Sequence, residues 1–460
     1  MRSKALRAFT CSLLLILLLG ILKRDSLHPA DLFVYRTDPF TGAHRFDWWT
    51  YELQTMVEKL VGRVAGIDQV AGLDKERQIQ QVREYFSLVQ EIGGLESEIV
   101  ATRARRGQRA DVTALQGELD AKRAERLRLE NIAENIIRRQ AEEVLLSQGI
   151  TLSPPLLHRW VLPPVEFEFQ SPPDFLIISR RDRIDRIGSL SLQPNLSLQR
   201  IEEIERRTDE LAVSSLVVPT GGVGAYPTVI IEEASLRFAI SAVVHEWAHN
   251  YLYFHPLGQH YGDSQELISM NETVASMIED EISLELERMF YPDIYESRLA
   301  EMTQEAPAGP ARVLEDEFSF NANMRKTRLR VEKLLAEGKV EEAEAYMEER
   351  RKKLVEMGYE VRKLNQAYFA FYGSYASGKG WAAATNPIGE QLSILRERRP
   401  SLADFVNTVA HMTSYQDLLD ELAHGSGGEF GSSSTGARYA HSRHHLGCPD
   451  AAVGVKRQRQ

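Results

Sequence analysis

Cysteine is nearly absent from this chain. Only Cys11 and Cys448 occur among 460 residues, one inside an N-terminal apolar run and the other in a tail rich in Gly, Ser and His. Two cysteines so placed support neither a disulfide framework nor a cysteine-based metal site. Cysteine usage therefore leaves the cellular compartment open.

An excess of positive charge is also missing. Lys and Arg total 55 against 66 Asp and Glu, which gives a formal net charge of -11, and the two signs are interleaved along the chain. Proteins that bind nucleic acid neutralise its phosphates with Lys and Arg, so this balance argues against nucleic acid as the main partner. Aromatic residues are few, at 8%, but 43% apolar residues suffice for at least one large core.

The apolar run at the N-terminus is short. Residues 8–22 are apolar, follow Arg2, Lys4 and Arg7, and end at Lys23 and Arg24. A full membrane span needs roughly 17–25 residues, yet no small-x-small cleavage site follows the run. We therefore expect residues 1–25 to be an uncleaved membrane anchor rather than a cleaved signal peptide, with the bulk of the chain outside the cytoplasm.

Residues 26–150 are expected to form a helical region. Three of its aromatic residues, Trp48, Trp49 and Tyr51, fit either a membrane interface or packing on the domain. Residues 73–146 are charge-dense, with apolar residues three and four apart, which predicts two long helices. The Arg-rich residues 103–109 then form the exposed turn of a coiled-coil-like hairpin rather than a phosphate-binding patch. Such an arm is a spacer or a docking surface for a protein partner.

The composition changes near residue 153, where an expected catalytic domain over residues 151–424 begins. Short strands are predicted at residues 165–169, 175–178, 216–218 and 228–231. The glycines of residues 219–227 lack the Lys-Ser/Thr of a phosphate loop and predict a bend or an edge strand beside a cleft. Helices are predicted at residues 326–336, ended by Gly338, at 340–371 and at 402–422. Residues 425–460 have the composition of a disordered tail.

The motif that carries chemistry is His245-Glu246-Trp247-Ala248-His249. Histidines four apart on a helix project from one face, so both imidazoles can reach one zinc ion. Glu246 is placed to act as a general base toward water whose pKa the metal lowers. The preceding residues 236–244 are strongly apolar, and polar side chains in a buried helix need partners.

A third ligand is predicted at Glu272. A second helix over residues 264–289 carries Ile268, Glu272, Ala275, Glu279 and Ile282 at helical spacing, which puts Glu272 in or beside an apolar stripe. A helix returning antiparallel to the first would bring this carboxylate to the two histidines. Two His and one Glu, with a fourth position open, are typical of a catalytic rather than a structural zinc site.

These residues resemble the gluzincin metallopeptidases, whose HExxH motif is followed by Asn-Glu-x-x-Ala, here Asn271 to Ala275. More narrowly, the chain is similar to bacterial proteins of the zincin group classed as aminopeptidases, which also have an Asn-x-Ala segment and a later Tyr, here Asn365, Ala367 and Tyr375. The resemblance implies zinc as cofactor, His245, His249 and Glu272 as its ligands, Glu246 as the base and Tyr375 as a donor to the oxyanion. Tyr372 competes with Tyr375 for that role.

One position departs from the family pattern. Thermolysin-like gluzincins usually carry an Asp four residues after the ligand Glu, where it orients the first His, and this chain has Ser276 there. Glu279, further along the same face, either takes over that role or is exposed or salt-bridged.

Together these features predict an α+β, predominantly helical protein. Its zincin-like domain would follow the helical hairpin and the N-terminal membrane segment. The expected function is zinc-dependent hydrolysis of peptide bonds by an anchored peptidase, with a peptide or protein as substrate. Two alternatives are a membrane-anchored interaction scaffold with a non-catalytic zincin-like domain and a metal hydrolase of non-peptide amides or esters.

Overall fold

The computed structural model describes residues 29–48, 51, 70, 72–106, 111–150, 161–223, 225–304, 320–373 and 387–424. This part is predominantly helical with small sheets, as expected for the fold class. The predicted anchor, Tyr375 and the tail lie outside the described residues. Among the helices that are described, none is long and apolar enough to cross a membrane.

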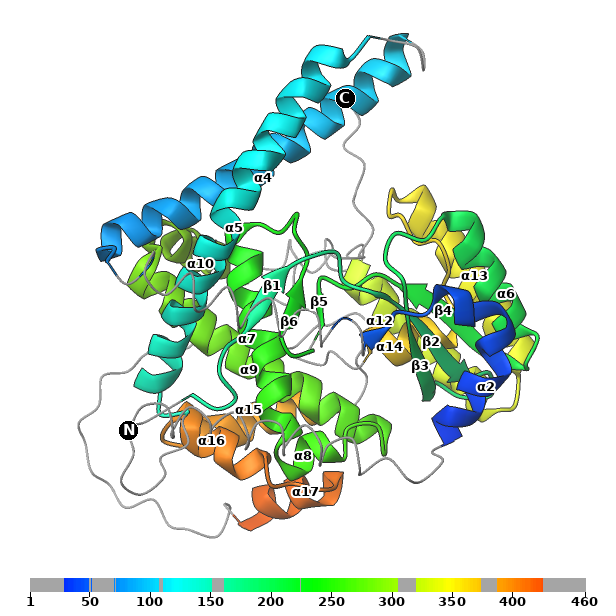
Figure 1. Cartoon of the computed structure of the whole chain (residues 1–460). Helices are drawn as coiled ribbons and strands as arrows, with labels where there is room; N and C mark the ends of the chain where they lie inside the picture. Colours follow the sequence, from blue (N-terminus) through cyan, green and yellow to red (C-terminus); the bar gives the residue numbers. More distant parts are fainter. Residues whose placement is uncertain are drawn as a thin grey trace.

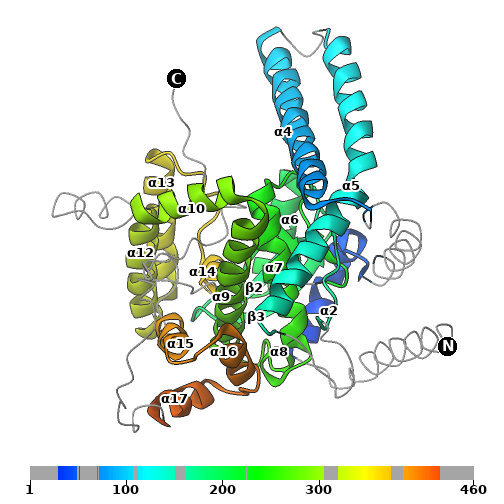
Figure 2. The same ribbon diagram turned by 90° about the vertical axis from the view of Figure 1, so that its left-hand side faces the viewer.

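The predicted arm consists of α4 (Lys75–Arg106) and α5 (Thr113–Ser147). Figure 2 shows the two helices side by side, with their connected ends pointing away from the rest of the molecule. The outer part holds a small apolar cluster of Ile92, Ile99 and Leu119. Toward the base, Val82, Tyr85 and Ile136 are buried in the main core. The arm is therefore continuous with the domain that it projects from.

The main core surrounds α7 (Leu236–Tyr253) and α9 (Gln265–Phe290). Each begins at a serine whose side chain accepts a backbone N–H of the first turn, Ser235 from Phe238 and Ser264 from Leu267. Beside α7 lies a small sheet in the order β1 (Phe167–Phe169), β6 (Thr228–Ile230), β5 (Gly222–Val223). The glycine-containing segment thus does supply an edge strand, β5, which pairs antiparallel with β6.

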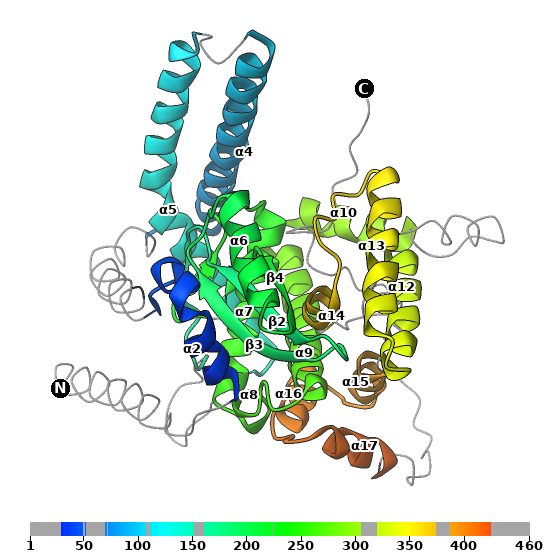
Figure 3. The same cartoon turned by 90° about the vertical axis from the view of Figure 1, so that its right-hand side faces the viewer.

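A second sheet forms the other half of the molecule (Figure 1). It is antiparallel, in the order β3 (Arg186–Leu192), β2 (Asp174–Arg180), β4 (Val213–Val218). Successive residues of a strand face opposite ways, so Leu176 and Ile178 pack toward α2 (Pro29–Thr41) and α6 (Leu198–Asp209). Ile177 packs toward the opposite layer, which contains α12 (Phe320–Ala336), α13 (Val340–Glu356) and α14 (Gln366–Tyr372). Figure 3 shows the sheet between these two layers.

Two of the predicted helices are wrong, because each is divided into two separate helices. The helix expected over residues 340–371 ends at Glu356, because Gly358 has a φ of +91° and Tyr359 N–H bonds back to the Leu354 carbonyl. A new helix, α14, starts after Asn365, whose side chain accepts the N–H of Tyr368. The predicted C-cap at Gly338 is confirmed, with a φ of +75°.

The helix expected over residues 402–422 is likewise two, α16 (Leu402–Val409) and α17 (Tyr415–His424). Asp417 accepts the backbone N–H groups of Thr413 and Ser414 and so favours a helix start there. Three further helices pack on α9: α8 (Pro256–Gln259), α10 (Pro292–Gln304) and α15 (Ile388–Glu397). A 3-10 turn, η1 (Gly42–His44), follows α2.

The early aromatics pack on the domain. Trp48 and Tyr51 contact Phe46 in a cluster with Ala225 and Val229. The Tyr51 hydroxyl donates to Glu168 at 2.6 Å. Of the two interpretations of Trp48 and Tyr51, the structure supports packing.

Candidate metal centre

Helices α7 and α9 bring His245, His249 and Glu272 together. His245 Nε2 lies 3.1 Å from His249 Nε2, and Glu272 Oε2 lies 3.7 Å and 3.4 Å from these two atoms. His245 is also next to Glu279, whereas His249 is next to Asn271, so the two helices run antiparallel. The three residues form a cluster that can hold a metal ion.

Hydrogen bonds on the far side of each ring assign the tautomers. His245 Nδ1 lies 3.0 Å from Glu279 Oε2, and His249 Nδ1 lies 2.8 Å from the side-chain oxygen of Asn271. Both oxygens are acceptors, so each Nδ1 carries the proton and donates it. In the neutral rings, both Nε2 atoms then present lone pairs to each other and to Glu272. Such outer partners are typical of metal-ligating histidines.

The distances allow one metal ion to reach all three side chains. A tetrahedral ion with bonds of about 2.0–2.2 Å separates neighbouring ligand atoms by about 3.3–3.6 Å, and the observed separations of 3.1, 3.4 and 3.7 Å lie in and on either side of that range. Glu272 Oε2 is buried and has no hydrogen-bond partner. An unpartnered buried carboxylate oxygen is costly unless a cation is close to it. The three side chains can therefore hold a metal ion, and the geometry does not identify which one.

The ionisation of the cluster agrees with a site for positive charge. Burial lowers the pKa of His245, but its contacts with Glu272 and Glu279 outweigh burial and hold it well above the usual value. Burial raises the pKa of Glu272, but the two imidazoles outweigh it and hold the pKa well below the usual value. Both shifts favour positive charge on the imidazoles and negative charge on Glu272, and protons compete with a metal ion for such a site.

Glu246 lies between the ligands on α7 and borders the edge strand. Burial raises its pKa, while the two imidazoles oppose the increase. A Cβ placed on Gly222 of β5 would lie 3.0 Å from Glu246 Oε1. A larger residue at position 222 would crowd this carboxylate, so the glycine gives Glu246 its room.

Glu279 contacts the first histidine of the motif. The sequence left open whether Glu279 orients His245 or is exposed or salt-bridged. The structure places the buried Glu279 carboxylate 3.0 Å from Nδ1 of His245, a contact that is both a hydrogen bond and, with a protonated ring, an ion pair, so an exposed Glu279 is excluded. Glu279 lies three residues beyond Ser276, slightly less than one turn of α9.

Tyr261 is a site residue that the sequence reasoning missed. Its hydroxyl donates to Glu272 Oε1 at 2.7 Å. It lies in the loop after α7, which also contains His255 and His260. Those histidines bond to the Tyr251 carbonyl and to Asp263. Helical spacing gives no signal for a loop tyrosine, so only the fold identifies it.

The structure does not test Tyr375 as the predicted oxyanion donor. Tyr375 lies outside the described residues. Tyr372 packs in the second half of the molecule against Tyr368 and Phe371. Asn365 caps α14 and donates to the Ser215 carbonyl, so its contacts are structural.

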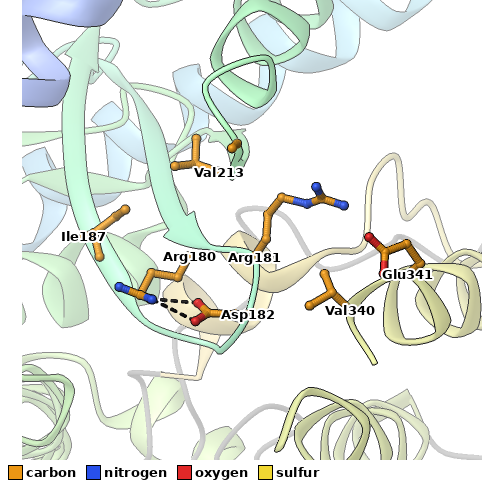
Figure 4. Close-up of a pocket in the computed structure, with 8 residues that line it drawn as sticks. Arg180, Arg181, Asp182, Ile187, Val213, Val340 and Glu341 are labelled. Atoms are coloured by element: carbon orange, nitrogen blue, oxygen red, sulfur yellow. Dashed lines mark hydrogen bonds and ion pairs between the residues drawn. The ribbon is translucent and has the colours of Figure 1, made fainter. Parts of the chain in front are cut away.

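A surface pocket lies apart from the metal centre (Figure 4). It has a volume of about 440 Å³ and is lined by the β2–β3 turn, the start of β4 and the start of α13. Its Arg180 is paired with Asp182, and the neighbouring Arg181 is paired with Glu344. None of the predicted site residues lines this pocket.

No family model matches the chain, and no curated protein or solved structure matches it significantly.

Proposed function

We propose that this protein is a zinc-dependent hydrolase that cleaves peptide bonds. The observation that supports this most directly is the convergence of three potential ligand atoms, from His245, His249 and Glu272, which lie 3.1, 3.4 and 3.7 Å from one another. Two His and one Glu leave a fourth zinc position for chemistry. The aminopeptidase subclass and the anchor in residues 1–25 are part of the proposal and rest on the sequence motifs alone.

The residues around the ligands have separable tasks. Zinc, when bound, polarises the scissile carbonyl and makes water more acidic. Glu246 takes the proton of the attacking water and passes it to the leaving amine. Glu279 and Asn271 hold the two imidazoles in the tautomer that directs Nε2 inward.

The edge strand favours an extended peptide as substrate. β5 lies at the end of its sheet and borders Glu246. An edge strand offers backbone groups with which an extended peptide can pair. A bound peptide would then run past the general base.

The test combines metal analysis with Glu246→Gln. We expect one zinc per chain in both proteins and a loss of hydrolysis of about 100-fold or more in the variant, because only the base is removed. Exposed Glu233, changed to Gln, is the matched control. A Glu246→Gln variant with full activity would overturn the mechanism.

Substrate panels separate the alternatives. Peptides with free and blocked N-termini distinguish an exopeptidase from an endopeptidase, and simple amides and esters test for a non-peptide hydrolase. Stoichiometric zinc with no hydrolysis of any panel member would instead indicate the interaction scaffold.

A further inference from the structure

Tyr261 connects the metal centre to the second sheet. Its hydroxyl donates to Glu272 Oε1 at 2.7 Å and accepts from Arg186 Nη2 at 2.9 Å. The Arg186 guanidinium also lies 5.4 Å from the centre of the Tyr261 ring. Arg186 begins β3, whereas Tyr261 follows α8, so the contact spans the two halves of the molecule.

The turn after α7 sets the place of this tyrosine. A Cβ on Gly258 would lie 2.2 Å from the Leu252 carbonyl oxygen, so the chain can fold back this tightly only with glycine there. Tyr261 N–H then bonds to the Gly258 carbonyl at 3.1 Å. The ring stands edge-on to His249, with centroids 6.3 Å apart. The hydroxyl is thereby directed at one oxygen of Glu272.

The two oxygens of Glu272 have different surroundings. Oε1 accepts the tyrosine hydroxyl, while Oε2 has no hydrogen bond and faces both histidine Nε2 atoms. A carboxylate whose oxygens are both available can bind a cation through one or through both of them. The Tyr261 hydroxyl occupies Oε1 and so leaves only Oε2 for a cation. The Arg186 guanidinium, which donates to the same hydroxyl, makes that hydroxyl a stronger donor.

We propose that Tyr261, supported by Arg186, holds Glu272 to zinc coordination through Oε2 alone and so keeps the remaining coordination position open. This inference rests on the proposed zinc site. Tyr261 is a positioning residue here, because it acts through Glu272. Without the hydroxyl, Oε1 would lose its hydrogen bond to Tyr261, and both carboxylate oxygens would be available to a bound ion.

The test uses Tyr261→Phe and Arg186→Gln, with Tyr253→Phe as control because Tyr253 is 60% exposed on the neighbouring stretch of chain. Zinc affinity is measured by competition with a chelator. Coordination number is read from the visible absorption of the cobalt(II)-substituted proteins, whose bands weaken when four ligands become five.

We expect Tyr261→Phe to weaken the cobalt bands and to lower kcat/KM by about 10–100-fold, while zinc affinity stays within about tenfold of the wild type. Arg186→Gln should weaken the cobalt bands and lower kcat/KM by smaller factors. This variant keeps Tyr261 and removes only the guanidinium that supports its hydroxyl. Tyr253→Phe should match the wild type.

One result would overturn the inference alone, namely a cobalt spectrum of Tyr261→Phe with wild-type intensity. If zinc affinity also fell by more than about tenfold, the hydroxyl would give the site structural support only. A wild-type protein without stoichiometric zinc would overturn the proposed function as well, so the two failures are distinguishable.

Discussion

The arm formed by α4 and α5 and the pair formed by α7 and α9 are both antiparallel helix pairs, but they bury different side chains. The outer arm is held by Ile92, Ile99 and Leu119. Its charged residues pair at the surface, as Lys122 does with Glu91 at 2.6 Å. The central pair instead buries ionisable groups on its contact face, including His245, Glu272 and Glu279.

This difference indicates where function resides. Exposed ion pairs contribute little to stability, so the arm is held mainly by its outer apolar cluster and by the burial of its base in the main core. Buried ionisable groups cost free energy unless each has a partner. His245, Glu272 and Glu279 are concentrated between α7 and α9, as the proposed metal site requires.

Of the substitutions that compare the two helix pairs, Glu279→Gln in α9 is expected to have the largest effect, a loss of zinc affinity. The amide keeps the shape but weakens the charge-assisted hydrogen bond to His245 Nδ1, so zinc affinity should fall by about 10–100-fold. Chelator competition measures it. The comparison would fail if an arm substitution such as Glu91→Gln lowered zinc affinity as much.

An intermediate effect is expected for Ile99→Val in the arm. Ile99 is buried in the outer cluster, and loss of one methyl group from such a site costs about 0.5–1.5 kcal/mol. Amide hydrogen exchange should accelerate in α4 and α5, while zinc affinity and hydrolysis remain at wild-type values. Altered hydrolysis would show that the arm and the centre are energetically coupled.

The smallest effect is expected for Glu91→Gln. The pairing with Lys122 lowers the pKa of Glu91 below its usual value of 4.5, so whatever stability the pair adds is present above that value. It is lost as the pH falls through the lowered pKa of the folded protein. Melting temperatures of wild type and variant should differ barely at pH 7 and coincide in acid. A difference that grows on acidification would contradict this sign.

Local signals predicted the regular elements well where one rule applied. Apolar residues three and four apart located the arm and both central helices, and Gly338 ended α12 as expected. The same periodicity missed two helix boundaries. Apolar residues continue at helical spacing past Gly358, where α13 has ended, and past the start of α17, where Asp417 accepts the Thr413 N–H. The strand β3 and helix α6 were not predicted, since their apolar residues are fewer and mixed with charge.

The sequence by itself determined which side chains could hold a metal ion, because four-residue spacing on a helix places His245 and His249 on one face whatever surrounds them. It also singled out Glu272, an acidic residue within an apolar stripe. Only the tertiary structure decided what surrounds these ligands. The sequence left the role of Glu279 open, and the packing of α7 against α9 places it next to His245. Tyr261 lies in a loop and Arg186 in a distant strand, and no local sequence pattern predicts their contact. Contacts between segments far apart in the chain depend on packing, and packing carries no fixed spacing in the sequence.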